Sequence, residues 1–223
     1  MLCSLAFGQG TMASVWPEVG DAGQTLATAN QTIGAGTLST ITGSLSAEEF
    51  NVDLADLYLI QIINPTLFSV STGDASSLNL VQDPMVFLFD PMGVGVTMND
   101  DAVGSQSFLG VGPPGDFGAG FYYLGISFAG VTPIDGIGAD IFDAFGDQSV
   151  LSPSPLLDFI GAPLTPNTAI AGAYSLALMG VVAAGMPEPT TSFLILGAFI
   201  SLLTARRGTG HIGLGTRDMQ SPR

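Results

Sequence analysis

Short apolar runs separated by Gly, Pro and Asp fill the first 185 positions of the sequence. Several runs alternate between apolar and polar residues, which is typical of a strand with one buried face. The run at 84–90 (PMVFLFD) is almost continuously apolar, as expected of a strand covered on both faces. No segment of helical period and length precedes Pro189. The predicted strands are 36–44, 56–62, 66–72, 84–90, 94–98, 120–128 and 173–181.

Many short strands joined by Gly/Pro/Asp turns predict an all-β fold, specifically an antiparallel, jelly-roll-like β-sandwich. We expect the strands at 56–62 and 66–72 to form a hairpin, because Asn64-Pro65 separates them. The stretch 133–166 is rich in Asp, Gly and Pro, and we expect a long, partly ordered excursion there. The residues predicted to face inward are Tyr58, Ile60, Ile62, Tyr122, Leu124, Ile126, Phe128, Tyr174, Leu176 and Leu178.

Charge is divided unevenly along the chain. The four basic side chains are all Arg, at 206, 207, 217 and 223, the only His is His211, and there is no Lys. In contrast, 18 of the 19 acidic side chains precede residue 206. The body therefore lacks the basic surface that nucleic-acid binding requires, the Lys of P-loop or Schiff-base chemistry, and the His of catalytic triads and histidine zinc sites. A body this acidic attracts divalent cations.

The C-terminal part combines three features in order. Pro187-Glu188-Pro189 blocks both helix and sheet, which predicts an extended and accessible backbone. Residues 189–205 (PTTSFLILGAFISLLTA) carry no charge and as a helix would be about 25 Å long, near the short limit for crossing a bilayer. Arg206-Arg207 follows at once and predicts a cytoplasmic end, with the acidic body across the membrane. The alternative is a buried core helix of a soluble domain.

This three-part tail, at residues 186–207, resembles the PEP-CTERM sorting signal of Gram-negative bacteria. In that family the tail is recognised by exosortase, a membrane transpeptidase-like enzyme. The protein is then cut near the PEP motif and is released or attached at the cell surface. Producers usually make exopolysaccharide. The resemblance implies exosortase and the membrane as partners before processing, and exopolysaccharide as a partner afterwards.

The N-terminal residues 1–8 (MLCSLAFG) are apolar but have no preceding basic segment. We interpret them as the remainder of a signal peptide whose start lies upstream, with processing around 6–13. An irregular N-terminal arm is the alternative. Cys3 is the only cysteine, so an intramolecular disulfide is excluded.

Three segments of the body resemble the pre-peptidase C-terminal domains of bacteria. Residues 51–60 (NVDLADLYLI) are similar to the D-x-D-x-Y opening strand of that family. Residues 86–101 are similar to its L-x-L-F-D-x-x-G…N-D-D hairpin, and 120–126 (GFYYLGI) to its G-x-Y-Y-L-x-I strand. The family is a small jelly-roll-like sandwich of secreted and surface proteins, which is often calcium-stabilised and sometimes binds carbohydrate.

Acidic and amide side chains at two turns are candidate calcium ligands. Ca²⁺ takes six to eight oxygen ligands, and pairing of 56–62 near the strand that leads to Asn99 would let these side chains converge. The alternative is turn chemistry, in which Asn and Asp accept backbone N–H bonds. The candidates are Asp53, Asp56, Asn99, Asp100 and Asp101.

These features predict four parts: a signal remnant and arm at 1–24, the sandwich at 25–184, the sorting signal with one transmembrane helix at 185–207, and a basic tail at 208–223. The predicted function is a non-enzymatic exported protein of the cell surface or extracellular matrix, sorted and cleaved by exosortase.

Two other hypotheses remain. The first is a permanently anchored acidic ectodomain that binds calcium or matrix polysaccharide. The second is a carboxylate hydrolase, although the side chains of Glu48 and Glu49 would diverge. The G-x-G-x-x-G at 110–115 does not predict a nucleotide site, because prolines occupy its middle positions and no βαβ unit surrounds it.

Overall fold

The structure is a computed structural model of the 223-residue chain. The residues that it describes are 13–48, 51–72, 81, 83–110, 118–146, 148–163 and 171–185. The chain divides into two units, Met1–Pro187 and Glu188–Arg223, and every described residue belongs to the first.

Several predicted features of the two ends lie outside the described residues. They are the signal remnant at 1–8, Pro187-Glu188-Pro189, the apolar run at 189–205 and Arg206-Arg207. In the described part of the chain, no helix has the length and hydropathy needed to cross a membrane.

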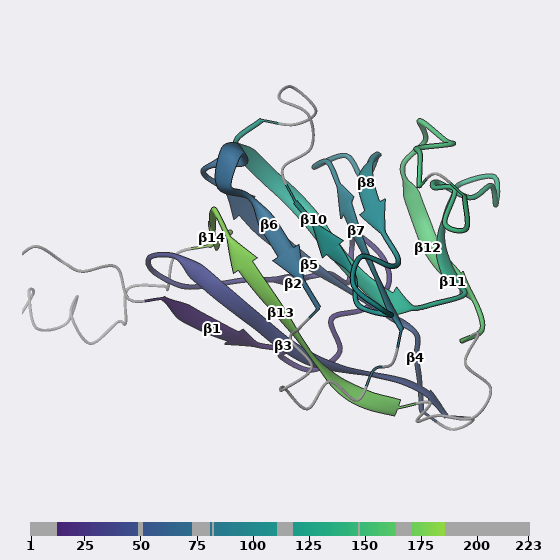
Figure 1. The fold of residues 1–223 in the computed structure, drawn as a ribbon, viewed down its shortest axis with the longest axis horizontal. Coiled ribbons are helices and arrows are strands. Elements are labelled where there is room, and N and C mark those ends of the chain that lie inside the picture. The colour runs from purple at the N-terminus through teal and green to yellow at the C-terminus, as the bar shows by residue number, and fades with distance from the viewer. Residues whose placement is uncertain are drawn as a thin grey trace, which may run out of the picture. The chain divides into compact units, whose positions relative to one another are not determined.

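The described residues are all-β, as predicted, and form two six-stranded sheets and one two-stranded sheet (Figure 1). Sheet A has the order β1 (Ser14–Pro17), β3 (Leu38–Glu48), β13 (Ala171–Met179), β6 (Ser69–Ser71) and β9 (Phe108–Leu109), with β4 (Asn51–Asp53) paired to β3. Sheet B has the order β14 (Val181–Ala183), β5 (Ala55–Ile62), β10 (Gly120–Phe128), β7 (Pro84–Phe89) and β8 (Gly95–Asn99), with β2 (Asn30–Gln31) paired to β5. The third sheet pairs β11 (Val131–Asp135) with β12 (Leu156–Gly161).

The sheets are mixed rather than purely antiparallel. β1 runs parallel to β3, and β2 runs parallel to β5, whereas the other pairs are antiparallel. Both parallel strands come from the first 31 residues, which sequence patterning left as an arm and a loop. Ala22 is also fully buried, so the folded body begins before residue 25, where the sandwich was expected to start.

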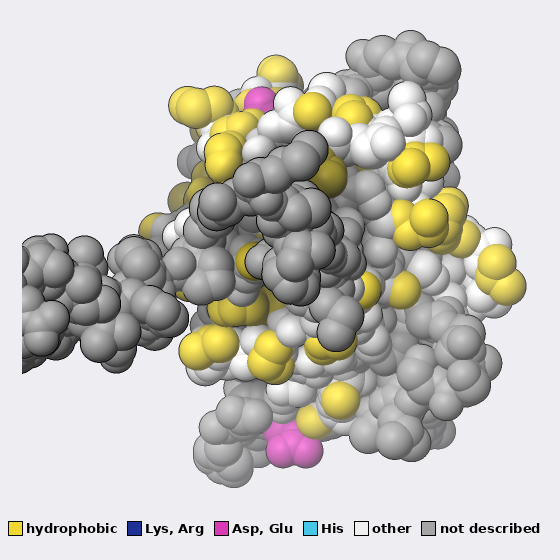
Figure 2. Space-filling view, turned by 90° about the vertical axis from the view of Figure 1, so that its left-hand side faces the viewer, with side chains coloured by type: hydrophobic (Ala, Val, Ile, Leu, Met, Phe, Trp, Pro, Cys, Tyr) yellow, Lys and Arg dark blue, Asp and Glu magenta, His cyan; other side chains and the backbone are white. Residues whose placement is uncertain are grey.

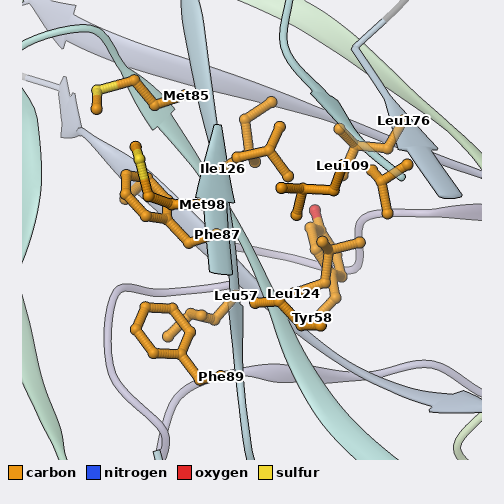
Figure 3. Close-up of a cluster of buried hydrophobic side chains, with 14 of the residues drawn as sticks. Leu57, Tyr58, Met85, Phe87, Phe89, Met98, Leu109, Leu124, Ile126 and Leu176 are labelled. Atoms are coloured by element: carbon orange, nitrogen blue, oxygen red, sulfur yellow. The ribbon is translucent and has the colours of Figure 1, made fainter. Parts of the chain in front are cut away.

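Sheets A and B share one hydrophobic core. Tyr58 pairs opposite Leu124 in sheet B, and its hydroxyl meets that of Tyr174 on β13 of sheet A. Figure 3 shows Leu109 and Leu176 of sheet A close to the same group. The predicted inward positions of β5, β10 and β13 are all buried, so the period-2 alternation located this core correctly.

The other face of sheet B is covered as well. β7 is buried at every position from Pro84 to Phe89, as predicted for its continuous apolar run. The ring of Phe87 lies 5.8 Å from that of Phe142 and 5.4 Å from that of Phe159, centroid to centroid. Both partners come from the β11–β12 region, so part of the stretch expected to be a partly ordered excursion forms a third layer over sheet B.

The predicted β7–β8 hairpin is present, but the predicted β5–β6 hairpin is wrong. β5 lies in sheet B and β6 in sheet A, with the 3-10 turn η1 (Pro65–Leu67) between them. Pro65 has no N–H for a ladder, which favours a change of sheet at this point. The chain returns from β13 to β14 at Gly180, whose φ is +73° and where an added Cβ would lie only 2.6 Å from the Asn64 carbonyl oxygen.

Candidate metal centre

Four carboxylates from three stretches of chain meet beside the junction of sheets A and B. Glu18 and Asp21 follow β1, Asp53 ends β4, and Asp56 lies near the start of β5. Each offers one oxygen, and these oxygens all lie within 4.8 Å of one another. We call this group the four-acid cluster.

Backbone N–H groups orient two of these carboxylates. The two oxygens of Glu18 accept bonds from the N–H of Ala22 at 3.0 Å and of Ser44 at 3.1 Å. Asp21 accepts a bond from the N–H of Gly23 at 2.8 Å. A carboxylate oxygen that accepts one hydrogen bond keeps a further lone pair, so both side chains are positioned and still able to bind a cation.

Asp56 is the buried member of the cluster, with 0% of its surface exposed. Its Oδ2 accepts a 2.5 Å bond from the hydroxyl of Tyr174. Tyr174 in turn lies 2.5 Å from the hydroxyl of Tyr58, which donates because the single proton of Tyr174 is already used. Oδ1 of Asp56 and Oδ1 of Asp53 are buried, and neither has a hydrogen-bond partner in the described part of the chain.

A glycine makes this arrangement sterically possible. Gly43 pairs opposite Tyr174 in sheet A. A Cβ on Gly43 would lie 2.3 Å from the Tyr174 hydroxyl oxygen and 2.8 Å from a Glu18 carboxylate oxygen. Only a residue without a side chain lets the tyrosine and the glutamate approach the cluster together.

Burial and mutual repulsion hold protons on the cluster when no cation is present. Burial, followed by the charge of Asp53, raises the pKa of Asp56 to about 9, against the lowering effect of the Tyr174 bond. Burial, followed by the charges of Asp21 and Glu18, raises the pKa of Asp53 to about 7. Burial also raises the pKa of Glu18. No Lys, Arg or His occurs in residues 1–205, so no side-chain cation within the described part of the chain can neutralise the group.

A second acidic group contains Asp83, Asp100 and Asp101, whose oxygens also lie within 4.8 Å of one another. Burial, followed by the charges of Asp101 and Asp83, raises the pKa of Asp100 to about 6. Oδ1 of Asp100 is buried without a partner among the described residues, but Asp101 is exposed and the other two side chains are only half-buried. This group is smaller and more open to water than the four-acid cluster.

The five predicted ligands therefore do not form one site. In the strand register, Asp56 pairs with Ile126, Ile126 with Val86, and Val86 with Asn99. Strands β10 and β7 thus separate the two acidic groups, which places Asp56 and Asn99 about 14 Å apart across the sheet.

Asn99 has a structural role. Its Oδ1 accepts the N–H of Phe108 at 2.8 Å, and its Nδ2 donates to Gln148 at 3.0 Å. This is the turn chemistry that was the alternative to calcium binding.

Sequence patterning missed Glu18, Asp21 and Asp83. The first two stand in the segment interpreted as an arm, and their only signal is the Glu-x-x-Asp spacing that follows the alternating residues 14–17. Asp83 adopts a φ of +57°, which the sequence does not predict. Tyr174 was expected only as an inward-facing core residue.

A pocket of about 360 Å³ adjoins the four-acid cluster, because two members of the cluster, Asp21 and Asp53, line it. Its remaining lining is mostly polar: Gly23, Gln24, Thr25, Thr28, Val52 and Asp158. On the face drawn in Figure 2, carboxylates occupy two small areas among scattered hydrophobic side chains. The acidic groups are therefore not spread evenly over that face.

No protein-family model, curated protein or solved structure matches this chain. The chemistry of the site is therefore inferred from its own geometry. Residues 13–185 contain no Cys or His, so the donors available are oxygens, which suit hard cations such as Ca²⁺.

Proposed function

We propose that the chain is a non-enzymatic protein exported to the cell surface or extracellular matrix, and that exosortase sorts and cleaves it at its C-terminal tail. The observation that carries this proposal is the order of Pro187-Glu188-Pro189, the uncharged run 189–205 and Arg206-Arg207 behind an acidic body. The acidic body lies outside the membrane and the arginines lie inside.

The extent of the folded body supports this proposal. Its last described strand, β14, ends at Ala183, and the described residues end at Gly185. Cleavage near Pro187-Glu188-Pro189 would leave every described strand in the product and remove the apolar run and all four arginines. The mature protein would then be more acidic than the full chain.

We also propose that the body is a jelly-roll-like sandwich related to pre-peptidase C-terminal domains. The three segments that resemble this family fall on β4–β5, β7–β8 and β10. Strands β5, β10, β7 and β8 are consecutive neighbours in sheet B, so the resemblance covers one continuous part of the fold.

The sorting proposal is tested by the mass of the mature protein from cells with and without exosortase. We expect a C-terminus near Glu188 only when exosortase is present. An intact Arg223 in exosortase-containing cells would contradict sorting and would favour the permanently anchored ectodomain.

A matched pair of variants tests the motif itself. Substituting Pro187 and Pro189 by Ala should block processing. The same change at Pro153 and Pro155, the other Pro-x-Pro of the body, should leave processing intact. If both double variants are processed alike, the Pro-Glu-Pro motif is not the recognition element. If both fail, misfolding is the cause, and a Glu188→Gln variant decides the role of the motif.

A further inference from the structure

We propose that Glu18, Asp21, Asp53 and Asp56 bind one Ca²⁺ ion, which joins the N-terminal segment to both sheets. This inference goes beyond the proposed function and does not depend on it, because a calcium-binding body could be sorted, anchored or freely secreted. Four properties of the cluster support it: the type of ligand, the size of the site, an unpartnered buried oxygen and access from solvent.

The donor set fits a hard cation of calcium size. Ca²⁺ binds carboxylate oxygens at 2.3–2.6 Å, so ligands on opposite sides of the ion are separated by roughly 4.6–5.2 Å. The four oxygens lie within 4.8 Å of one another, which matches that sphere. Mg²⁺ requires octahedral ligands at 2.0–2.1 Å and keeps several waters, so we expect it to bind more weakly.

Asp56 supplies the observation that separates this cluster from a chance gathering of acids. Its carboxylate is fully buried and belongs to the cluster, yet one of its oxygens has no hydrogen-bond partner among the described residues. A buried polar atom without a partner costs free energy, so natural proteins seldom retain one without a ligand. A coordinated cation satisfies this oxygen directly.

The ligands are also held in the way that metal ligands usually are. Tyr174 fixes Asp56, while the N–H groups of Ala22 and Ser44 fix Glu18. Hydrogen bonds to the ligands orient a metal site and raise its affinity. Gly43, by lacking a side chain, permits two of these contacts at once.

The site has a route from solvent and additional oxygen donors nearby. Asp21 is exposed, and both Asp21 and Asp53 line the 360 Å³ pocket. Four monodentate carboxylates leave two to four positions of a calcium ion to be filled. Water in this pocket can fill them, and it also provides the path by which the ion enters.

The test is calcium binding by the purified full chain after removal of divalent cations with a chelator. We expect one Ca²⁺ per chain by calorimetry, and a melting temperature that rises by roughly 5–10 °C when free calcium is about 100 times Kd. Mg²⁺ should bind at least about 10-fold more weakly. The proposal is overturned if about 10 mM CaCl₂, which exceeds the Kd of weak extracellular sites, gives neither heat nor a shift in melting temperature. It is overturned equally if Mg²⁺ binds more tightly than Ca²⁺.

Variants locate the ion. Asp56→Asn should abolish both signals, whereas Asp100→Asn makes the same substitution in the second acidic group and should leave them unchanged. If Asp56→Asn does not fold, Asp21→Asn at the exposed ligand should fold and weaken binding about 10- to 100-fold. Wild-type affinity in Asp56→Asn or Asp21→Asn, or loss of binding in Asp100→Asn, would show that the ion binds elsewhere.

Discussion

Two buried aspartates of this protein have opposite ionisation behaviour. Asp135, at the end of β11, accepts N–H bonds from Ile137 and Ala139 at 3.0 Å each and the hydroxyl of Ser152 at 2.7 Å. These bonds, the Ser152 bond first, lower its pKa. Asp56 has as little exposed surface, but among the described residues it accepts only the Tyr174 bond, and burial raises its pKa to about 9.

The difference has two causes: hydrogen bonds outweigh desolvation at Asp135, whereas desolvation and the charge of Asp53 outweigh the single Tyr174 bond at Asp56. Asp135 closes a turn and has no need of a ligand. Asp56 sits among other acids with an oxygen left over. A complete donor set therefore marks a structural aspartate, and an incomplete one marks a candidate ligand.

The largest effect is expected when the same substitution is made at both aspartates, in chelator at pH 7. Asp135→Asn should lower the melting temperature by roughly 5–10 °C, because its three donors lose an ionised acceptor. Asp56→Asn should change it by less than about 2 °C, because an amide replaces a carboxyl group that is already neutral. Thermal unfolding followed by circular dichroism measures both. Equal losses would contradict the claim that Asp135 is ionised and Asp56 neutral at this pH.

The pH dependence of the cation-free protein gives the next largest effect. The pKa of Asp56 is about 9 and that of Asp53 about 7, against about 3.9 for aspartate in the unfolded chain. The folded state therefore binds more protons over this range, and stability falls as pH rises from about 4 to about 9. The titratable groups that face Asp56 are Glu18, Asp21, Asp53, Tyr58 and Tyr174.

Melting temperatures from pH 4 to 10 in chelator measure this slope. We expect Asp56→Asn to flatten the part between pH 7 and 9, because only Asp56 titrates there. Asp135 behaves in the opposite sense, since its lowered pKa adds stability that is lost as pH falls below about 4. A cation-free stability that increases between pH 5 and 8 would contradict the assignment of raised pKa values.

Removing a single hydroxyl should have a smaller effect. Tyr174→Phe deletes the only donor to Asp56 among the described residues and leaves Tyr58 without its acceptor, so we expect a loss of about 1–2 kcal/mol in the free energy of unfolding. It should also weaken calcium binding at pH 7, because the lost bond favours ionised Asp56. Denaturant unfolding and calcium titration measure the two effects. Tyr123→Phe is the control, with an expected change of less than about 0.5 kcal/mol.

Substitution of Asn99 should have the smallest effect. It tests a side chain whose hydrogen bonds are already made within the fold. Asn99→Ala removes the acceptor for Phe108 and the donor to Gln148, and we expect a loss of about 1 kcal/mol. Because the Asn99 side chain is hydrogen-bonded to Phe108 and Gln148 and is not part of the four-acid cluster, the calcium-induced rise in melting temperature should be unchanged. A smaller calcium-induced rise in melting temperature would mean that Asn99 is a calcium ligand.

The sequence predicted the core of sheet B well, because β5, β7 and β10 carry strong alternation or a continuous apolar run. The sequence did not predict the short strands or their pairing. β1 and β2 have four and two residues, too few for a period to be read, and their parallel partners are distant along the chain. The β5–β6 hairpin was wrong because proximity in sequence does not say which sheet a strand joins.

The candidate site could be predicted only in part, for the same reason. Asp53 and Asp56 were identified because they stand beside a clear strand. Glu18 and Asp21 reach them only through the pairing of β1 with β3. The prediction placed both acidic groups in one site. It was wrong because the sequence does not show that strands β10 and β7 lie between them in sheet B.

The place of β13 in sheet A has a consequence for how the chain acquires its structure. β13 lies between β3 and β6, although it comes about a hundred residues after β6 in the chain (Figure 1). A chain that emerges N-terminus first must therefore hold two unpaired strand edges until residues 171–179 arrive, and such distant pairings form slowly. Pairing within sheet A is therefore completed only after most of the folded body has been delivered.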